Sequence, residues 1–276
     1  MKNQTPYIFF SATTALIVLF SHSASVSAHV EVEDERDFDY IRGSEKGPEK
    51  WGKLKKEWSS CNNGSLQSPV DMSNQRVKII RNAGNWRRNY KPSNSTVKNR
   101  GHDISVQWEG KEAGSIYING TQYFLQQCHW HSPSEHTING RRYEMELHMV
   151  HENTDPNVKN KIAVVGLLYK IGQPDSFLSK LLNDVNLGSM INHEQGKNMG
   201  MVDPRNIKMD GKKYYRYLGS LTVPPCTEGV IWTINNKIRT VSKGQVKALR
   251  EAVHDYAEQN ARPVQPLNRR EIQLHA

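Results

Sequence analysis

The sequence predicts a single, mostly β domain of the α+β class, in which a large, twisted and mainly antiparallel sheet carries peripheral helices. Three observations predict this class. Short runs rich in β-branched and aromatic residues, each ended by Gly, Asn, Asp or Pro, fill the chain from about residue 66 to 240. Helical periodicity occurs in only two segments, and no strand–helix–strand pattern repeats. A chain of 276 residues can also bury a large core without disulfide staples.

The first 28 residues have the layout of a secretory signal peptide. Lys2 is their only charged residue, an apolar run extends from Ala12 to Phe20, and Ser25-Val-Ser-Ala28 offers small residues for cleavage after Ala28. The apolar run is shorter than the roughly 20 residues that a membrane-spanning helix needs. We therefore expect a signal peptide over 1–28, one domain over 29–276, and no membrane partner.

The remaining predicted elements are an irregular arm, two helices and a series of strands. Residues 29–60 are expected to form an irregular arm with turns at Gly43 and Gly47-Pro48. Two amphipathic helices are expected, one over Asp175–Val185 and one over Ser242–Gln259, which opens with a Ser-x-x-Gln capping box. The clearest predicted strands are Asp103–Trp108, Ser115–Asn119, Tyr123–His131, Tyr143–His151, Ile162–Tyr169 and Val230–Ile234.

The net positive charge of the chain does not by itself indicate an anionic macromolecule as partner. The chain has 37 basic and 28 acidic side chains, a formal charge of +9 that becomes +8 when the leader and its single lysine are removed. The basic residues occur as scattered doublets, without a basic helix or a nucleic-acid-binding motif. Aromatic residues are spread along the chain, which excludes intrinsic disorder. We expect a basic surface and no nucleic-acid partner.

Histidine is the residue that clusters. Five of the eleven histidines fall between positions 129 and 151. Residues two apart on a strand share a face, so His129 and His131 project together, and His148 lies on the following strand. The connection Ile138-Asn-Gly-Arg141 carries an Asn-Gly turn signal, which makes the two strands neighbours. Three imidazoles are therefore expected to converge from adjacent strands.

Three neutral imidazoles suit a catalytic zinc ion with an open fourth position, because each is a borderline-soft ligand and none adds charge. Gln127 and Glu146 each lie two residues before a ligand, on the same face, where they are placed to fix imidazole tautomers. His136 and His151 fall outside this pattern and receive structural roles. Cys128 alternates away from His129 and is expected to pack as a small apolar residue.

The same residues also resemble a second metal motif. His129-x-His131 followed by Glu135 is similar to the first metal motif of cupins, in which the Glu is itself a ligand of iron or manganese. That motif has a Gly six residues before the first His, where this chain has Tyr123, and Pro133 interrupts the strand that should carry the Glu. The second cupin motif is not found, so the three-histidine zinc site is preferred.

Further blocks make the chain resemble the α-class carbonic anhydrases, in particular their plant-type secreted branch. The resemblance covers about residues 38–270 and implies a twisted ten-stranded sheet with zinc in a conical cleft. It also implies the reversible hydration of carbon dioxide to bicarbonate and a proton. The matching blocks are Gly47-Pro-Glu-Lys-Trp51, Gln67-Ser-Pro69, Asn99-Arg-Gly-His102, His129-Trp-His131, Ser134-Glu-His-Thr137, Glu146-Leu-His148-Met-Val-His151, Ser220-Leu-Thr-Val-Pro-Pro225 with Trp232, and Arg262-Pro-Val-Gln-Pro266.

The resemblance implies a role for each catalytic residue. Zinc held by His129, His131 and His148 makes hydroxide available at neutral pH. The hydroxyl of Thr222 accepts the proton of that hydroxide and donates its own to ionised Glu135, which aims an oxygen lone pair at carbon dioxide.

The resemblance also implies an apolar substrate wall and a path for the proton. His102 stands at the proton-shuttle position, and an unperturbed histidine pKa of about 6.5 suits exchange with buffer. Tyr40 and Asn99 are expected to order the connecting waters. Two departures from the family are Val223 and Ser105. The substrate-binding residues implied are Val150, Val164, Leu221, Thr222, Val223 and Trp232.

Covalent features indicate the compartment. Cys61 and Cys226 occupy positions where secreted members of the family carry a disulfide, which would fix the Thr222 loop. We predict the secretory pathway and an extracellular location, with the plastid stroma, reached through the secretory route, as the alternative. Predicted N-glycosylation sites, which begin Asn-x-Ser/Thr sequons, are Asn63, Asn94 and Asn119.

Two functions fit these residues. One is an active zinc carbonic anhydrase whose small-molecule partners are carbon dioxide and bicarbonate. The other is a storage or binding protein on the same scaffold with weak or no activity, as some plant relatives are. The zinc ligands, Glu135, Thr222 and His102 are all present, which favours the enzyme. We expect a monomer or a dimer.

Overall fold

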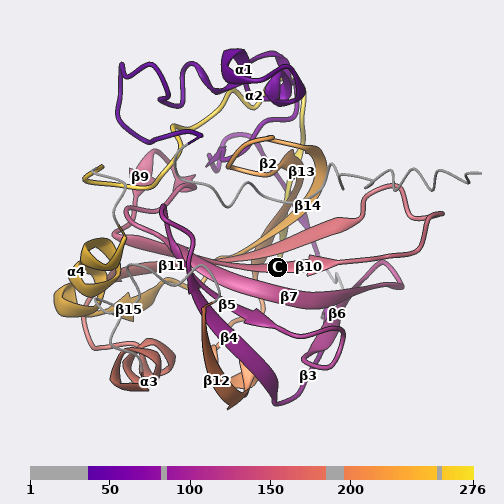
Figure 1. The fold of residues 1–276 in the computed structure, drawn as a ribbon. Coiled ribbons are helices and arrows are strands. Elements are labelled where there is room, and N and C mark those ends of the chain that lie inside the picture. Colours follow the sequence, from indigo (N-terminus) through magenta and orange to yellow (C-terminus); the bar gives the residue numbers. More distant parts are fainter. Residues whose placement is uncertain (1–36, 82–85, 185–195, 254–256) are drawn as a thin grey trace, which may run out of the picture.

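The computed structural model describes residues 37–81, 86–184, 196–253 and 257–276. The predicted signal peptide, residues 1–28, lies outside the described residues. The domain from the arm to the C-terminus forms around one large sheet, as the alternating strands predict (Figure 1).

Thirteen of the described strands form this sheet, and ten of them lie in one continuous order, β12-β4-β5-β7-β10-β11-β14-β13-β16-β2. Only the pairs β11–β14, β11–β15 and β16–β2 are parallel. The prediction of a mainly antiparallel sheet with a ten-stranded centre is confirmed. The strands are β2 (Val77–Ile80), β3 (Arg87–Tyr90), β4 (Ser93–Asn99), β5 (Ile104–Trp108), β6 (Gly114–Ile118), β7 (Thr121–His131), β10 (Met145–Glu152), β11 (Ile162–Ile171), β12 (Lys197–Val202), β13 (Tyr214–Ser220), β14 (Glu228–Asn235), β15 (Arg239–Val241) and β16 (Ile272–His275).

A second, small sheet includes two strands that lie between β7 and β10 in the sequence. It contains β1 (Asp71–Met72), β8 (Thr137–Ile138) and β9 (Arg141–Arg142). Asn139 and Gly140 join β8 to β9 with φ angles of 51° and 74°, the left-handed conformation that an Asn-Gly hairpin turn requires. The predicted turn therefore forms a hairpin of its own, and β7 and β10 are antiparallel neighbours on either side of it.

Four helices and two short 3-10 turns surround the sheet in the described residues. The N-terminal arm contains α1 (Trp51–Leu54), η1 (Lys56–Trp58) and α2 (Ser60–Asn63), and Figure 1 shows α1 and α2 together, away from α3 and α4. The first predicted amphipathic helix is α3 (Ser176–Asp184). The other turn is η3 (Pro204–Asn206).

The second predicted helix is shorter than expected. Helix α4 (Lys243–Ala252) opens with the predicted capping box, in which Ser242 and Gln245 exchange hydrogen bonds. The prediction that it continues to Gln259 is wrong, because Val253 is extended, with φ −95° and ψ 149°. The chain must leave the helix here so that Asn260 can reach the backbone of β7, as described below.

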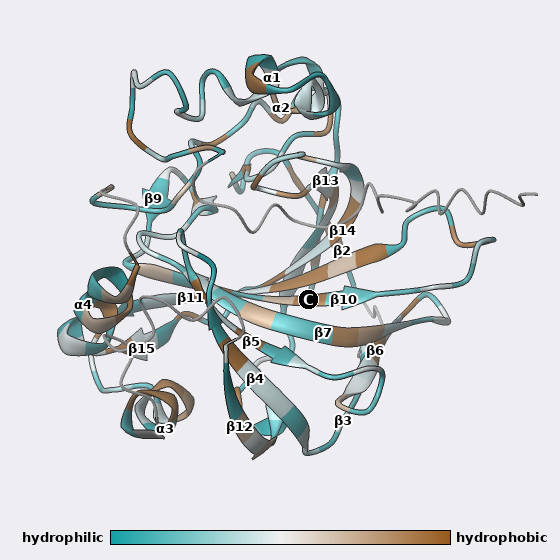
Figure 2. Ribbon diagram, viewed as in Figure 1, coloured by the Kyte–Doolittle hydropathy of each residue, from teal (hydrophilic) through white to brown (hydrophobic). Residues whose placement is uncertain are grey.

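Apolar side chains fill both faces of the sheet. One cluster, under α3 and α4, includes Leu147, Met149 and Cys128. A second, on the opposite face, includes Val164, Leu221 and Trp232. In Figure 2 the hydrophobic colour is found mainly on strands and on α3, whereas the connecting loops are mostly hydrophilic. A third cluster joins the arm to the loop after β13 and contains Phe38, Tyr40, Trp51, Trp58, Cys61, Val223 and Cys226.

Within the described part of the chain, no helix is both long and apolar enough to cross a membrane.

Candidate metal centre

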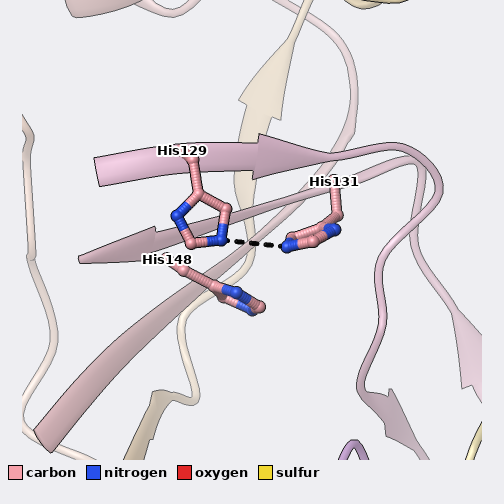
Figure 3. A group of neighbouring side chains, drawn as sticks. All are labelled: His129, His131 and His148. Atoms are coloured by element: carbon pink, nitrogen blue, oxygen red, sulfur yellow. Dashed lines mark hydrogen bonds between the residues drawn. The ribbon is translucent and has the colours of Figure 1, made fainter. Parts of the chain in front are cut away.

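The pairing of β7 with β10 brings three histidines together. His129 and His131 lie on one face of β7, and His148 lies directly opposite His129 on β10. All three side chains are buried, and each offers a nitrogen within 4.8 Å of the nitrogens of the other two. Figure 3 shows the three rings turned toward a common point. Strand parity predicted this convergence.

In each of these rings one nitrogen faces the other two histidines, and the other, outer nitrogen faces a hydrogen-bond acceptor. Gln127 Oε1 lies 2.8 Å from His129 Nδ1, and Glu146 Oε1 lies 2.8 Å from His148 Nε2. The carbonyl oxygen of Asn260 lies 2.6 Å from His131 Nδ1. These oxygens accept and do not donate, so each outer nitrogen carries the proton. The inner nitrogens, His129 Nε2, His131 Nε2 and His148 Nδ1, are left as lone pairs.

The inner nitrogens fit a zinc ion. His129 Nε2 and His131 Nε2 lie 3.1 Å apart (Figure 3), and two lone pairs at that distance repel each other unless a cation binds both. Zinc–nitrogen bonds of about 2.0–2.1 Å in a tetrahedron give a nitrogen–nitrogen distance of about 3.3 Å. A neutral three-imidazole donor set also matches the ligand preference of zinc.

Burial favours the neutral form of two of these histidines, His129 and His148. It is the largest influence on His129, whose pKa lies well below the ordinary histidine value, and on His148, whose pKa is also lowered. The Glu146 carboxylate opposes the effect of burial on His148 without cancelling it. Neutral imidazole is the form that binds a metal.

A second group of metal-capable residues lies beside the first. His136, Glu146 and His148 also bring three donor atoms within 4.8 Å of one another. Here hydrogen bonds use every acceptor position of the carboxylate. Glu146 Oε2 accepts from the backbone nitrogens of Glu135 and His136 at 2.9 and 2.8 Å. Glu146 Oε1 accepts from His136 Nδ1 at 2.7 Å as well as from His148. This group is a hydrogen-bond junction.

The charge of Glu146 is maintained by its neighbours. Burial acts to raise the pKa of this carboxyl, but His136 and His148 outweigh it and hold the pKa well below the ordinary range. His136 therefore has the structural role that the sequence predicted for it.

The junction extends to the loop that carries Thr222. His136 Nε2 accepts a hydrogen bond from the Tyr217 hydroxyl at 2.6 Å, and that hydroxyl lies 2.8 Å from Ser68 Oγ. Ser68 and Ser220 exchange two hydrogen bonds through their backbone nitrogens and side chains, at 2.9 and 3.0 Å. A continuous chain of buried groups thus connects His148 to the start of the Ser220-Leu-Thr222 loop.

Glu135 lies against the three histidines. Its Oε1 accepts from the backbone nitrogen of Arg262 at 2.9 Å, and its Oε2 lies 3.6 Å from His131 Nε2 and 4.0 Å from His148 Nδ1. Oε2 is buried and has no hydrogen-bond partner among the described residues. Thr222 is also buried, on the loop after β13, and among the described residues it does not donate to Glu135 Oε2.

Most of the predicted apolar wall forms one surface. Val164, Leu221 and Trp232 belong to the same buried cluster, with Val150 packed against it. The Trp232 ring lies 4.8 Å from the His148 ring, and its Nε1 donates to the carbonyl of Ser220 at 2.9 Å.

Val223 differs from the other predicted wall residues. It belongs to the third cluster, with the aromatic rings of the arm. Ser105, the other departure from the family, lies opposite His129 on β5 and is fully buried.

The predicted proton shuttle is covered by the arm. His102 is only 1% exposed, and its ring lies 5.1 Å from that of Phe38 and 6.5 Å from that of Tyr40. Its Nε2 lies 3.5 Å from Asp103 Oδ2. Asn99 donates to the carbonyl of Ala252 at 2.7 Å.

Asn260 is a residue that the sequence did not predict. Besides accepting from His131, it accepts from the backbone nitrogen of Ser132 through Oδ1 and donates to the carbonyls of His102 and Trp130 through Nδ2. Its position, 129 residues after His131, gives no local signal; the neighbouring Arg262-Pro block was the one sequence feature that pointed to this segment.

The cysteine predictions are confirmed. Cys61 and Cys226 form a disulfide with a Cα–Cα distance of 5.0 Å, which connects α2 to the loop after Thr222. Cys128 is the free cysteine and is buried in the core. The sequon residues Asn63, Asn94 and Asn119 are all exposed.

The fold and the site define a class: a large, mainly antiparallel sheet whose central strands carry three buried histidines with the arrangement of a metal site. The chain belongs to the eukaryotic-type carbonic anhydrase family, whose family model matches residues 46–276.

Individual relatives cover nearly the whole chain. It is 53% identical to alpha carbonic anhydrase 7 of Arabidopsis thaliana over 97% of this chain and 95% of that protein. A crystal structure of dioscorin complexed with ascorbate is similar, with a TM-score of 0.79 and 43% identity over 86% of this chain and 97% of that one. The α-carbonic anhydrase of Thermovibrio ammonificans, in complex with the inhibitor sulfanilamide, has a TM-score of 0.74 and 33% identity, covering 86% of this chain and 98% of that one.

Proposed function

We propose that this protein catalyses the reversible hydration of carbon dioxide to bicarbonate and a proton, at a zinc ion held by His129, His131 and His148. The observation that carries the proposal is the set of three inward lone pairs, each fixed by an acceptor behind its ring. Zinc in such a site supplies a water-derived nucleophile at neutral pH.

Glu135 and Thr222 are proposed to orient the reacting oxygen. Glu135 Oε1 is occupied by the backbone nitrogen of Arg262, and Oε2 is the buried acceptor that remains. An ionised carboxylate can only accept, so a Thr222 hydroxyl that donates to Oε2 keeps its own lone pairs for the reacting group. The Thr222 hydroxyl therefore donates only to Glu135 and accepts only from the reacting group, which fixes the orientation of that group.

Substrate and proton are proposed to use different sides of the site. Carbon dioxide is apolar and suits the surface formed by Val150, Val164, Leu221 and Trp232. The proton is proposed to leave by way of His102, which lies beneath Phe38 and Tyr40, so its exchange with buffer passes the arm.

A second function has one observation in its favour. The similarity to dioscorin, a protein solved with bound ascorbate, supports a binding or storage protein on the same scaffold. The complete ligand set and its three acceptors favour the enzyme.

The two functions are separated by stopped-flow hydration of carbon dioxide on purified protein, with zinc content measured on the same sample. The enzyme requires about one zinc per chain and a hydration rate that a His148→Ala variant loses. Zinc-replete wild type without measurable hydration would leave the binding protein as the function.

We also propose that the protein enters the secretory pathway, with cleavage after Ala28, and becomes glycosylated. The disulfide Cys61–Cys226 and the exposure of Asn63, Asn94 and Asn119 support this. N-terminal sequencing of the protein from its native tissue tests the cleavage, and a mass shift on glycosidase treatment tests the glycans; a start before residue 29 and an unchanged mass contradict them.

A further inference from the structure

A pocket of about 170 Å³ lies apart from the three histidines, none of which lines it. Three separate segments form its wall: the arm contributes Tyr40 and Arg42, β9 contributes Arg142, and the C-terminal segment contributes Gln259 and Ala261. Tyr40 is the residue through which this pocket borders the proposed proton path, since its ring also packs near His102.

Within the described part of the chain, the positive charge of this pocket faces no acidic side chain. Arg42 is exposed and Arg142 is partly buried, and the lining contains no acidic residue. Three other arginines of the described residues do have carboxylate partners: Arg100 pairs with Asp103, Arg205 with Asp203, and Arg239 with Asp210. Among the described residues, no salt bridge or side-chain hydrogen bond is formed by either guanidinium of the pocket.

Two guanidinium groups around one cavity are suited to an oxyanion. The planar fork of arginine matches the oxygens of a phosphate or a carboxylate, and pairing with an anion removes the repulsion between like charges. The Gln259 amide adds a donor. A cavity of about 150 Å³ holds a molecule the size of benzene, so the pocket accommodates a small oxyanion and excludes a nucleotide.

We propose that this pocket is a binding site for a small oxyanion, phosphate or a short carboxylate, held between Arg42 and Arg142. The bound anion connects the arm to β9 and to segment 259–263. Both neighbours of Ala261 contact the metal centre: the Asn260 carbonyl accepts from His131, and the Arg262 nitrogen donates to Glu135. The anion therefore fixes the outer side of the segment whose inner side positions the site. This binding does not depend on carbon dioxide hydration.

The test is isothermal titration of the zinc-loaded, full mature chain with inorganic phosphate, at constant ionic strength set with chloride. Wild type is expected to bind phosphate saturably, and Arg42→Gln and Arg142→Gln to weaken binding by about tenfold or more each. Arg141→Gln is the matched control, because it removes the same charge from the adjacent residue, which is exposed and packs on Tyr143 at 5.0 Å. This control is expected to bind as wild type does.

Several outcomes overturn the proposal. These are no saturable binding by wild type, equal binding by all three variants, or displacement of phosphate by an equal concentration of chloride. Phosphate bound at the three histidines would not contact Arg42 or Arg142. Loss of phosphate binding in the Arg42→Gln and Arg142→Gln variants alone therefore locates the site in the pocket. A second titration with acetate distinguishes the source: equal affinity indicates a carboxylate ligand, and weaker affinity a phosphate. An Arg142→Lys variant keeps the charge and tests the fork if Arg142→Gln melts early.

Discussion

Two groups of three metal-capable side chains lie side by side in this protein, and they share His148. Both are buried, and both bring their donor atoms within 4.8 Å of one another. In the first group, three imidazoles turn lone pairs toward one point. In the second, His136 and His148 turn their N–H groups toward the carboxylate of Glu146, which accepts four hydrogen bonds.

Both groups are buried and rich in histidine, so the two differ mainly in which ring nitrogens carry protons and where those N–H groups point. Glu146 supplies the negative charge that orders every N–H around it, and by holding the outer proton of His148 it leaves the inner nitrogen of that ring as a ligand. The second group therefore orients the His148 ring of the first group. Proximity of histidine and carboxylate does not identify a metal site; the donor and acceptor roles behind each ring do.

The largest effect is expected from His129→Ala, which removes a ligand and leaves the junction untouched. Zinc content should fall below one per chain, and the hydration rate should fall by about three orders of magnitude or more, because the nucleophile is lost. Stopped-flow kinetics with metal analysis measures both. A variant that keeps its zinc and its rate would show that His129 is no ligand.

His136→Ala should have the opposite profile. It removes one of the four hydrogen bonds to the Glu146 carboxylate and the imidazole acceptor of the Tyr217 hydroxyl, both in a buried site, so the free energy of unfolding should fall by about 3 kcal/mol. Zinc should still bind at one per chain. Urea denaturation of wild type and variant measures the loss; a loss of zinc with unchanged stability would reverse the assignment of the two groups.

The junction also predicts a pH dependence. The folded pKa of Glu146 lies well below its unfolded value of about 4.5, so the unfolded chain binds the proton first. The stability that Glu146 contributes is complete above about pH 4.5 and is lost as the pH falls toward the folded pKa. His129 and His148, with lowered pKa values, add a loss that begins below about pH 6.5. In zinc-free protein, Glu146→Gln should abolish the part of this loss of stability that occurs below about pH 4.5. The measurement is the free energy of unfolding of wild type and variant between pH 7 and 3. The same decrease in both proteins over this range would contradict the prediction.

The smallest effect is expected from Gln127→Ala. It removes one acceptor behind one ring, so zinc affinity should fall by about tenfold while the fold is kept. Competition with a chromophoric chelator measures the affinity. The matched variant Gln126→Ala alters the neighbouring glutamine, which donates to the carbonyl of Phe124 and touches no ligand, and should leave the affinity unchanged.

The sequence predicted what depends on local periodicity. With one side chain per face at every second position, His129, His131 and His148 had to meet once β7 and β10 were neighbours, and Gln127 and Glu146 were carried to their places by the same rule. Six strands of the sheet, β5, β6, β7, β10, β11 and β14, were predicted for this reason. The family resemblance added the disulfide Cys61–Cys226, which no local rule pairs.

What the sequence did not predict depends on contacts between distant segments. Tyr217 joins His136 across 81 residues, and Asn260 joins His131 across 129. Helix α4 was predicted too long because Val253 continues its apolar periodicity, whereas the contacts of Asn260 with β7 take the chain out of the helix. The burial of His102 likewise follows from the position of the arm.

The C-terminal segment has a consequence for the order of events at the ribosome. The carbonyl of Asn260 completes the orientation of His131, and the backbone of Arg262 fixes Glu135, while β16 (Ile272–His275) inserts between β13 and β2. His131 and Glu135 therefore emerge more than a hundred residues before the groups that fix them, so the nascent chain makes these two contacts only after Asn260 and Arg262 have been translated.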